Sequence, residues 1–406
     1  MIRCTVGVMA YNEAQNVERT LLALLAQRVE SVEIVEIIVI ASGCTDSTVE
    51  LAEEIASAHP IITVEVEAHR TGKAAAIRRL MAAARGDVIV LVGADTLPEP
   101  TAIEYLVQPF TDSNVGMTGA RVIPLNPPTT WLGFTVQMLW HVHHRLALRK
   151  PKLGELVAFR NVIDDFPEDT STDEPAIEAL VATKGYRLVY TPRAVVYNRG
   201  PESVEEFSNQ RRRVFAGQVR IALRYGYFTS SLRFRHVLPL ALDAVRSYPR
   251  FFVWTFAAMA VEFRARVLGL YDALRGHEDV VWRTAPSSKT MTGHSEPITL
   301  ISIKWPPGSL DSMSFFRELR RLPAPAGSVF WWDDHQGEML LSVGTGESPL
   351  EWLQDRIEGA TREHVRPHPV YANTPGSLSV SWVRPIFGDQ PVVSCRLVTF
   401  RSPALD

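Results

Sequence analysis

The sequence predicts an α/β fold in which helices cover both faces of a mainly parallel sheet. Two observations predict it: β-prone apolar runs alternate with segments of helical period, and the runs are rich in Val and Ile. Strands that alternate with helices form βαβ units, which place the helices on both faces of the sheet. The four runs lie at residues 5–10, 35–41, 62–68 and 87–93.

The three connections between these runs each contain an expected helix. Residues 11–27 give a turn and a helix, and residues 42–58 give a loop, a cap and a helix. Residues 71–86 give a helix that Gly86 closes. Ligands bind at the carboxyl ends of the strands in such sheets, so the loops that follow the four strands are expected to converge on one rim.

The sequence predicts a first domain and three further parts. Residues 1–230 form the first domain, and residues 231–282 form a helical extension for which membrane proximity is one interpretation. Residues 283–297 are rich in Ser, Thr and Pro and lack an apolar period, which is typical of a linker. Residues 298–406 follow an order close to β-α-β-β-α-β and predict a small C-terminal α+β module.

Composition restricts the class of protein. The 406 residues are 46% hydrophobic with a net charge of −3, which gives no overall attraction to nucleic acids. Three well-separated cysteines without a CxxC motif argue against a zinc site and favour a reducing compartment. No signal peptide or membrane-spanning run is evident, so we expect a cytoplasmic protein, with the inner face of the membrane as an open alternative.

Five motifs in order resemble family 2 glycosyltransferases over roughly the first 230 residues. The resemblance implies the GT-A fold, a Rossmann-like mixed sheet with helices on both faces. It also implies inverting transfer from a nucleotide-sugar donor. The five motifs are VGVMAYNEAQNVERTL, IIVIASGCTDSTVELA, RTGKAAAIRRLMAAARGDVIVLVGADT, TDEPAIEALVATKGYRLVYTPRAVVYNRGPES and NQRRRV.

Asp95 is the candidate ligand for a divalent cation. The leaving diphosphate develops negative charge, which preorganised electrostatics must stabilise. Mg²⁺ binds through one or two carboxylates together with substrate phosphates and water, so a single Asp suffices. The resemblance implies Mg²⁺ or Mn²⁺ here, because Asp95 matches the last Asp of the family's D-x-D motif while Gly93 replaces the first. Thr96 or water would then substitute for the first Asp, and the alternative is an ordinary turn Asp before Pro98.

The remaining donor-binding candidates lie on the other rim loops. Arg70 and Lys73 are expected to face the diphosphate at a helix start, where backbone amides favour phosphate. The resemblance implies that Glu13, which follows Asn12, touches the nucleoside; the alternative is a capping pair. Asp46 matches the retained Asp of the family's D-G-S-T-D motif. The base stays open among uridine, guanosine and thymidine.

The catalytic base is expected in the Asp173-Glu174 pair. An inverting transfer needs a base that removes a proton from the acceptor hydroxyl, and a carboxylate with a raised pKa suits this task. The resemblance implies Glu174 first and Asp173 second, with helix capping as the alternative. Gln210 and Arg213 match the family's Q-x-x-R motif, in which Arg213 would clamp the diphosphate. The adjacent Arg211 and Arg212 are expected to be surface charges.

The sequence therefore predicts an inverting, metal-dependent glycosyltransferase. One alternative is a catalytically inactive nucleotide-sugar-binding or scaffolding protein, because Gly93 departs from the motif. A nucleotidyltransferase is a further alternative, which the missing glycine-rich loop after the first strand disfavours. The expected acceptor is a glycan, a lipid-linked glycan or a small molecule. Peripheral membrane contact, and a homo-oligomer or partner protein bound through residues 298–406, are open interpretations.

Overall fold

The computed structural model describes most of the chain up to Gly276 and the strands beyond it. Its described ranges are 1–167, 169–233, 236–237, 239–240, 251–276, 299–304, 329–333, 338–343, 368–369, 377–384 and 393–400. The chain divides into two compact units, Met1–Leu125 with Met138–Met291, and Asn126–Gln137 with Thr292–Asp406. The predicted linker at 283–297 lies outside the described residues.

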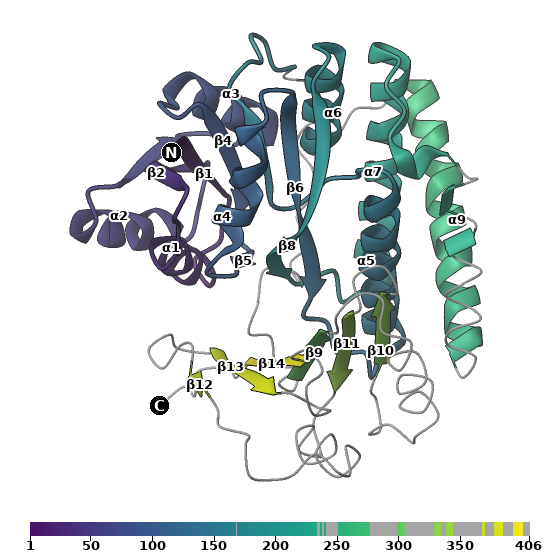
Figure 1. Cartoon of the computed structure of the whole chain (residues 1–406). Coiled ribbons are helices and arrows are strands. Elements are labelled where there is room, and N and C mark those ends of the chain that lie inside the picture. Colours follow the sequence, from purple (N-terminus) through teal and green to yellow (C-terminus); the bar gives the residue numbers. More distant parts are fainter. Residues whose placement is uncertain are drawn as a thin grey trace. The chain divides into compact units, whose positions relative to one another are not determined.

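The first unit is built on an eight-stranded mixed sheet with the order β3-β2-β1-β4-β7-β6-β8-β5 (Figure 1). The first four strands along the chain are parallel neighbours, whereas β7 runs antiparallel to both β4 and β6. The predicted α/β fold is therefore confirmed. The strands are β1 Ile2–Ala10, β2 Val32–Ser42, β3 Ile62–Glu67, β4 Val88–Gly93, β5 Leu97–Pro98, β6 Val115–Pro124, β7 Val157–Arg160 and β8 Arg187–Asn198.

Helices cover both faces of this sheet, because successive strand residues point to opposite faces and both faces are apolar. On β4, for example, Val88 and Val90 join one core cluster while Ile89 joins the other. Helices α1, α2 and α4 contribute to the first cluster, and α3, α6 and α7 contribute to the second. The helices are α1 Val17–Leu25, α2 Thr48–Ala58, α3 Lys73–Ala83, α4 Ala102–Val107, α5 Trp131–Arg149, α6 Asp173–Thr183, α7 Val204–Tyr225 and α9 Phe252–Arg275, with 3-10 helices at Gln108–Thr111 and Ser230–Leu232.

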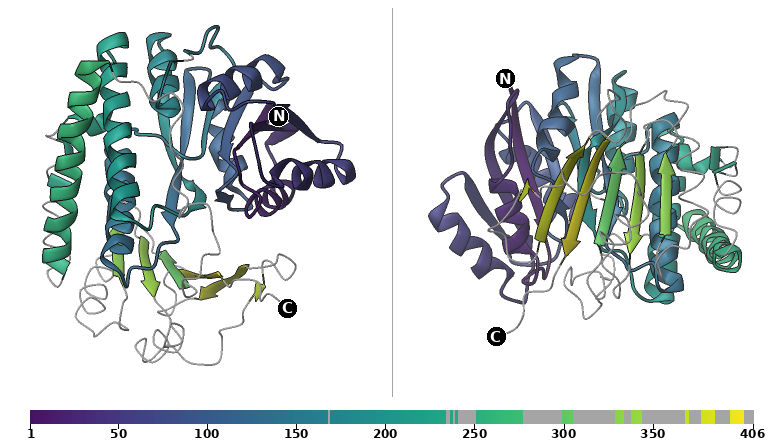
Figure 2. Two further views of the ribbon diagram at one scale, coloured as in Figure 1. Left: turned by 180° about the vertical axis from the view of Figure 1, so that it is seen from behind. Right: turned by 60° about the horizontal axis from the view of Figure 1, so that its bottom comes forward.

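Helices α7 and α9 lie side by side and are joined by ion pairs (Figures 1 and 2). Arg211 binds Glu262 through two hydrogen bonds of 2.7 and 3.0 Å, and Arg212 binds Asp272 at 2.5 and 2.6 Å. The Arg211 side chain is only 11% exposed. The expectation of surface charge was therefore wrong for Arg211. The Arg212 side chain is 39% exposed, so it does lie at the surface, although it is paired with Asp272. No helix in the described part of the chain is long and apolar enough to cross a membrane.

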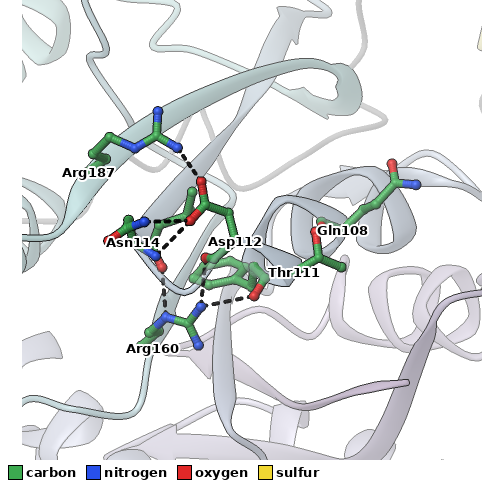
Figure 3. Close-up of polar contacts among 8 residues, drawn as sticks. Gln108, Thr111, Asp112, Asn114, Arg160 and Arg187 are labelled. Atoms are coloured by element: carbon green, nitrogen blue, oxygen red, sulfur yellow. Dashed lines mark hydrogen bonds and ion pairs between the residues drawn. The ribbon is translucent and has the colours of Figure 1, made fainter.

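Arg160 is the last residue of β7 and lies opposite the first residue of β4, Val88, where it binds the turn before β6 (Figure 3). Its guanidinium donates to the carbonyl oxygens of Val115, Phe110 and Asp112 at 2.7, 2.9 and 2.9 Å. The Asp112 carboxylate in turn pairs with Arg187 at 2.6 Å. These bonds satisfy backbone carbonyls in the turn that leads into β6, at the edge away from the predicted rim.

The second unit contains a six-stranded antiparallel sheet with the order β10-β11-β9-β14-β13-β12 (Figure 2). Its strands are β9 Thr299–Lys304, β10 Val329–Asp333, β11 Glu338–Val343, β12 His368–Pro369, β13 Ser377–Arg384 and β14 Val393–Phe400. The helices predicted for the C-terminal module lie outside the described residues.

Candidate active site

The loops that follow β1, β2 and β3 meet, as the parallel sheet predicts. The Asn12 side-chain oxygen accepts a hydrogen bond of 2.8 Å from the Thr45 amide. The Arg70 guanidinium lies 3.9 Å above the Tyr11 ring. Gly43 has a φ of +62°, and a Cβ at this position would lie 2.4 Å from the Arg70 nitrogen. Only glycine fits this close approach of two rim loops.

Asp46 ties the second rim loop to the first. Its carboxylate accepts hydrogen bonds from the Ala14 amide at 3.2 Å, the Thr48 amide at 3.1 Å and the Thr48 hydroxyl at 2.5 Å. Partial burial alone would raise the pKa of Asp46, but these bonds outweigh it and lower the pKa below its usual range. Asp46 therefore stays ionised and has a structural task at the start of α2, whatever else it binds.

Glu13 is buried at the end of β1 and is held in place from two sides. Its amide donates to the Thr48 hydroxyl at 2.7 Å, and its carboxylate accepts from the Asn16 side chain at 2.9 Å. Asn16 is the residue at the start of α1, and its side chain makes no capping hydrogen bond.

Asp95 lies in the turn directly after β4, half-buried at the rim. A Cβ placed on Gly93 would lie 2.5 Å from the Asp95 Oδ1 atom, so the carboxylate lies over the residue that replaces the first Asp. The Thr96 hydroxyl donates to the Gly93 carbonyl at 2.8 Å. The Thr20 hydroxyl lies within hydrogen-bonding distance of the Ala94 and Thr96 carbonyls. Thr96 is buried by these turn contacts, so the expectation that it could replace the missing Asp finds no support.

Lys73, Asp173 and Glu174 come together although 100 residues separate them along the chain. The Lys73 ammonium pairs with the Asp173 carboxylate and lies 3.4 Å from Glu174 Oε1. Asp173 has a side chain that is only 7% exposed. Burial alone would lower the pKa of Lys73, but the Asp173 and Glu174 carboxylates raise it above its usual value. The start of α3 is thus joined to the acidic start of α6.

One face of α7 is directed at the loop that ends at Asp173. A Cβ on Gly217 would lie 2.4 Å from the Thr172 hydroxyl, so glycine permits close packing there. Arg220 donates to the Ser171 hydroxyl at 3.2 Å. Gln210 and Arg213 precede Gly217 by seven and four residues, which places them on the same face of the helix.

Glu155 is a fourth carboxylate in this region that no sequence motif indicated. It is half-buried and has a φ of +61°, which is unusual for a residue other than glycine. Burial, together with the carboxylates of Asp95 and Glu174, raises the pKa of Glu155 to about 8 against the opposing effect of Lys73. The carboxylates of Asp95, Asp173 and Glu174 therefore all act on Glu155 in the same direction.

Comparison with known proteins identifies a family for residues 5–160. Residues 5–160 match the sequence profile described as Glycosyl transferase family 2. The chain carries a family 2 glycosyltransferase domain. Its mixed sheet with helices on both faces has the layers that the sequence resemblance implied.

The chain spans about half the length of the curated relatives it matches. It is 28% identical over 229 residues to the poly-β-1,6-N-acetyl-D-glucosamine synthase of Staphylococcus aureus strain COL, covering 53% of this chain and 54% of the synthase. It is 31% identical over 127 residues to glycosyltransferase AglD of Haloferax volcanii, covering 30% of this chain and 20% of that protein. A mannosyltransferase from Pyrobaculum calidifontis, solved with GDP-Man and Mn²⁺, shares 23% identity and a TM-score of 0.49, over 68% of this chain and 88% of that one.

The buried carboxyl group of Glu178 binds the segment that precedes β7. Glu178 is 1% exposed, accepts a hydrogen bond of 2.8 Å from the Leu153 amide and accepts another of 3.1 Å from the Tyr227 hydroxyl. It therefore holds the segment that leads to Glu155. Burial raises the pKa of Glu178 to about 7, although both hydrogen bonds and Lys152 oppose the shift.

Glu178→Gln is expected to remove part of the pH dependence of stability. The folded protein keeps Glu178 protonated up to about pH 7, whereas the unfolded chain releases this proton near pH 4.3. The free energy of unfolding should therefore fall by about 2.5 kcal/mol between pH 5 and pH 7.5, and Gln should abolish that fall. Urea unfolding of both proteins at pH 5 and pH 7.5 measures the difference. Parallel stability curves would contradict the assigned burial of a protonated carboxyl group.

Proposed function

We propose that the chain is an inverting glycosyltransferase that moves a sugar from a nucleotide-diphosphate donor to an acceptor hydroxyl with Mg²⁺ or Mn²⁺. The ion-pair cluster of Lys73 with Asp173 and Glu174 carries the proposal. It joins a helix start that favours phosphate to the acidic pair that would act on the acceptor. Donor and acceptor groups would then react at one rim of the sheet.

Asp95 is the residue that would hold the cation. Within the described ranges, no group of three or more His, Cys, Asp and Glu side chains is arranged as a metal site. A cation here would take its other ligands from the donor phosphates and water, the arrangement that Mg²⁺ favours. When bound, it would supply positive charge that stabilises the departing diphosphate.

Glu174 is the proposed base, with Asp173 as the second candidate. The Asp173 carboxylate is buried against Lys73, while the Glu174 side chain is 20% exposed and more accessible to an acceptor. Glu174 would take the proton from the acceptor hydroxyl as that oxygen attacks the anomeric carbon, opposite the leaving phosphate. Asp173 and Lys73 would fix the position of the helix start that carries Glu174.

The donor would lie across the three preceding rim loops. We propose that Asn12, Glu13 and Asp46 line the nucleoside side, and that Arg70 and Lys73 face the diphosphate. Gln210 and Arg213 would close over the diphosphate from α7, where guanidinium geometry suits a pair of phosphate oxygens.

A second candidate function is a nucleotide-sugar-binding protein without transferase activity. Gly93 in place of the first motif Asp favours it, because it removes one carboxylate from β4. The placement of Lys73, Asp173 and Glu174 opposes it. The family match gives no support to the nucleotidyltransferase alternative.

We propose a cytoplasmic protein whose helix α9 contacts the inner membrane face, since its apolar stripe is exposed and flanked by Arg264 and Arg275. The exposed large side chains of this helix are Phe252, Val253, Phe256, Phe263, Val267, Leu270, Tyr271 and Leu274.

The acceptor would be a glycan, a lipid-linked glycan or a small molecule. The catalytic domain would be residues 1–230, and the membrane-proximal extension would be residues 231–282. Residues 298–406 would bind a partner protein or a second copy of the chain.

Thermal unfolding in the presence of UDP, GDP, TDP and ADP, each with and without Mg²⁺ or Mn²⁺, tests the proposal. One nucleotide should stabilise the protein in a cation-dependent manner, by about 2.7 kcal/mol at one hundred times Kd. The same nucleotide's sugars should then be assayed for transfer and hydrolysis. Binding without either reaction would select the inactive binding protein, and no cation-dependent stabilisation by any nucleotide would contradict both functions.

A further inference from the structure

The end of β4 lacks a carboxylate that the rest of its motif leads one to expect. Gly93 occupies the position of the first Asp of D-x-D, and Asp95 alone remains. The hydroxyl of Thr96 cannot supply the missing oxygen ligand, because it is buried in the turn and donates to the Gly93 carbonyl. Any replacement must therefore come from another element.

The register of the sheet indicates which residue replaces it. Strands β4 and β7 are antiparallel, with partners that run from Val88–Arg160 to Leu91–Val157. Each step forward along β4 is a step backward along β7. If this register is continued two steps beyond the last pair, Glu155 comes opposite Gly93. The segment before β7 would then bring a carboxylate to the end of β4, where β4 has none.

The backbone of Glu155 has an unfavourable conformation that neighbouring contacts hold in place. Its φ of +61° lies in the left-handed region, which is unfavourable for a residue with a Cβ. The buried Glu178 carboxylate fixes the segment through the Leu153 amide at 2.8 Å. Strained backbone that neighbouring contacts hold in place is characteristic of functional sites.

The surrounding charges favour a cation between Glu155 and Asp95. Within the described ranges, no hydrogen bond or ion pair engages either carboxylate. Asp173 and Glu174 also raise the pKa of Glu155, and Lys73 lowers it. Lys73 already pairs with Asp173. A divalent cation would offset the remaining repulsion between carboxylates.

We propose that Glu155 is the second protein ligand of the cation that Asp95 holds, and that it replaces across the strand pair the carboxylate missing at Gly93. This inference rests on the proposed function. It predicts that the carboxylate can be returned to β4. A Cβ on Gly93 would clash only with the far end of the flexible Asp95 side chain, since its contact with Thr96 Cγ2 at 3.5 Å is an ordinary one. Gly93→Asp therefore requires a rotation of the Asp95 side chain rather than a backbone shift.

Titration of Mn²⁺ into the protein, with the nucleoside diphosphate chosen by the thermal panel, tests the inference by electron paramagnetic resonance. Glu155→Gln should weaken Mn²⁺ binding about tenfold or more. The double variant Glu155→Gln with Gly93→Asp should recover most of that loss, which a merely structural role of Glu155 would not allow. Glu33→Gln, an exposed carboxylate at the other end of β2, is the control and should bind as the wild type does.

The outcomes separate this inference from the proposed function. If the wild type binds Mn²⁺ through Asp95 and Glu155→Gln binds it equally well, Glu155 is not a ligand and only this inference fails. If Glu155→Gln weakens Mn²⁺ binding and the added Gly93→Asp does not restore it, a carboxylate at position 93 cannot replace the one at position 155. The inference is then also overturned. If the wild type shows no nucleotide-dependent Mn²⁺ binding, the proposed function itself fails.

Discussion

Glu174→Gln is expected to lower the transfer rate by about 10²–10⁴-fold, the usual contribution of a general base. Gln keeps the size of the side chain but cannot accept the acceptor proton. The ion pair between Lys73 and Asp173 stays intact, so the start of α6 should keep its position. Nucleotide binding should therefore remain within about twofold of the wild type. Turnover under saturating donor and calorimetric titration of the nucleotide measure the two quantities.

Asp173→Asn is the matched variant for this test. Its carboxylate is buried against Lys73, so its loss should lower the unfolding temperature and reduce turnover less than Glu174→Gln does. Full activity in Glu174→Gln with an inactive but folded Asp173→Asn would move the base by one residue. Activity in both variants would rule out the proposed chemistry.

Asp95→Asn is expected to abolish the cation-dependent part of nucleotide binding. An amide offers one neutral oxygen where the carboxylate offers two charged ones, and a hard divalent cation strongly prefers the carboxylate. The unfolding temperature of the variant with nucleotide should be the same with and without Mn²⁺. Without ligand, its stability should match the wild type, because no described side chain bonds to Asp95.

Asp112→Asn is the control, since Asp112 lies at the amino end of β6 beside Arg187, away from the rim (Figure 3). It should keep the full cation-dependent shift. A cation-dependent shift that survives in Asp95→Asn would show that another group holds the metal.

The sequence predicted the first half of the sheet well for a physical reason. Strands buried on both faces must be apolar at every position, as Ile89 and Val90 show by packing into opposite cores. The antiparallel insertion of β7 between β4 and β6 could not be predicted, because four strand residues carry no signal of their partners. The placement of Arg211 was missed for the same reason: its partner Glu262 lies 51 residues away on another helix.

The candidate site was predicted where motif and local structure coincide. Lys73 and Asp95 follow strands and were expected at the rim, and the structure places them there. The contact between Lys73 and Asp173 depends on tertiary packing, which local periodicity does not specify. Glu155 belongs to no motif, and only the strand register and its left-handed backbone single it out.

Anomalous diffraction at the manganese edge offers the sharpest test of where the cation and donor bind. Crystals would be soaked with Mn²⁺ and the nucleoside diphosphate that gives the largest thermal shift. The expected map has one manganese peak bonded to the Asp95 carboxylate and to both phosphates, on the rim that carries Lys73 and Glu174. A manganese–nucleotide complex bound elsewhere on the molecule, with Asp95 left unliganded, would contradict this placement.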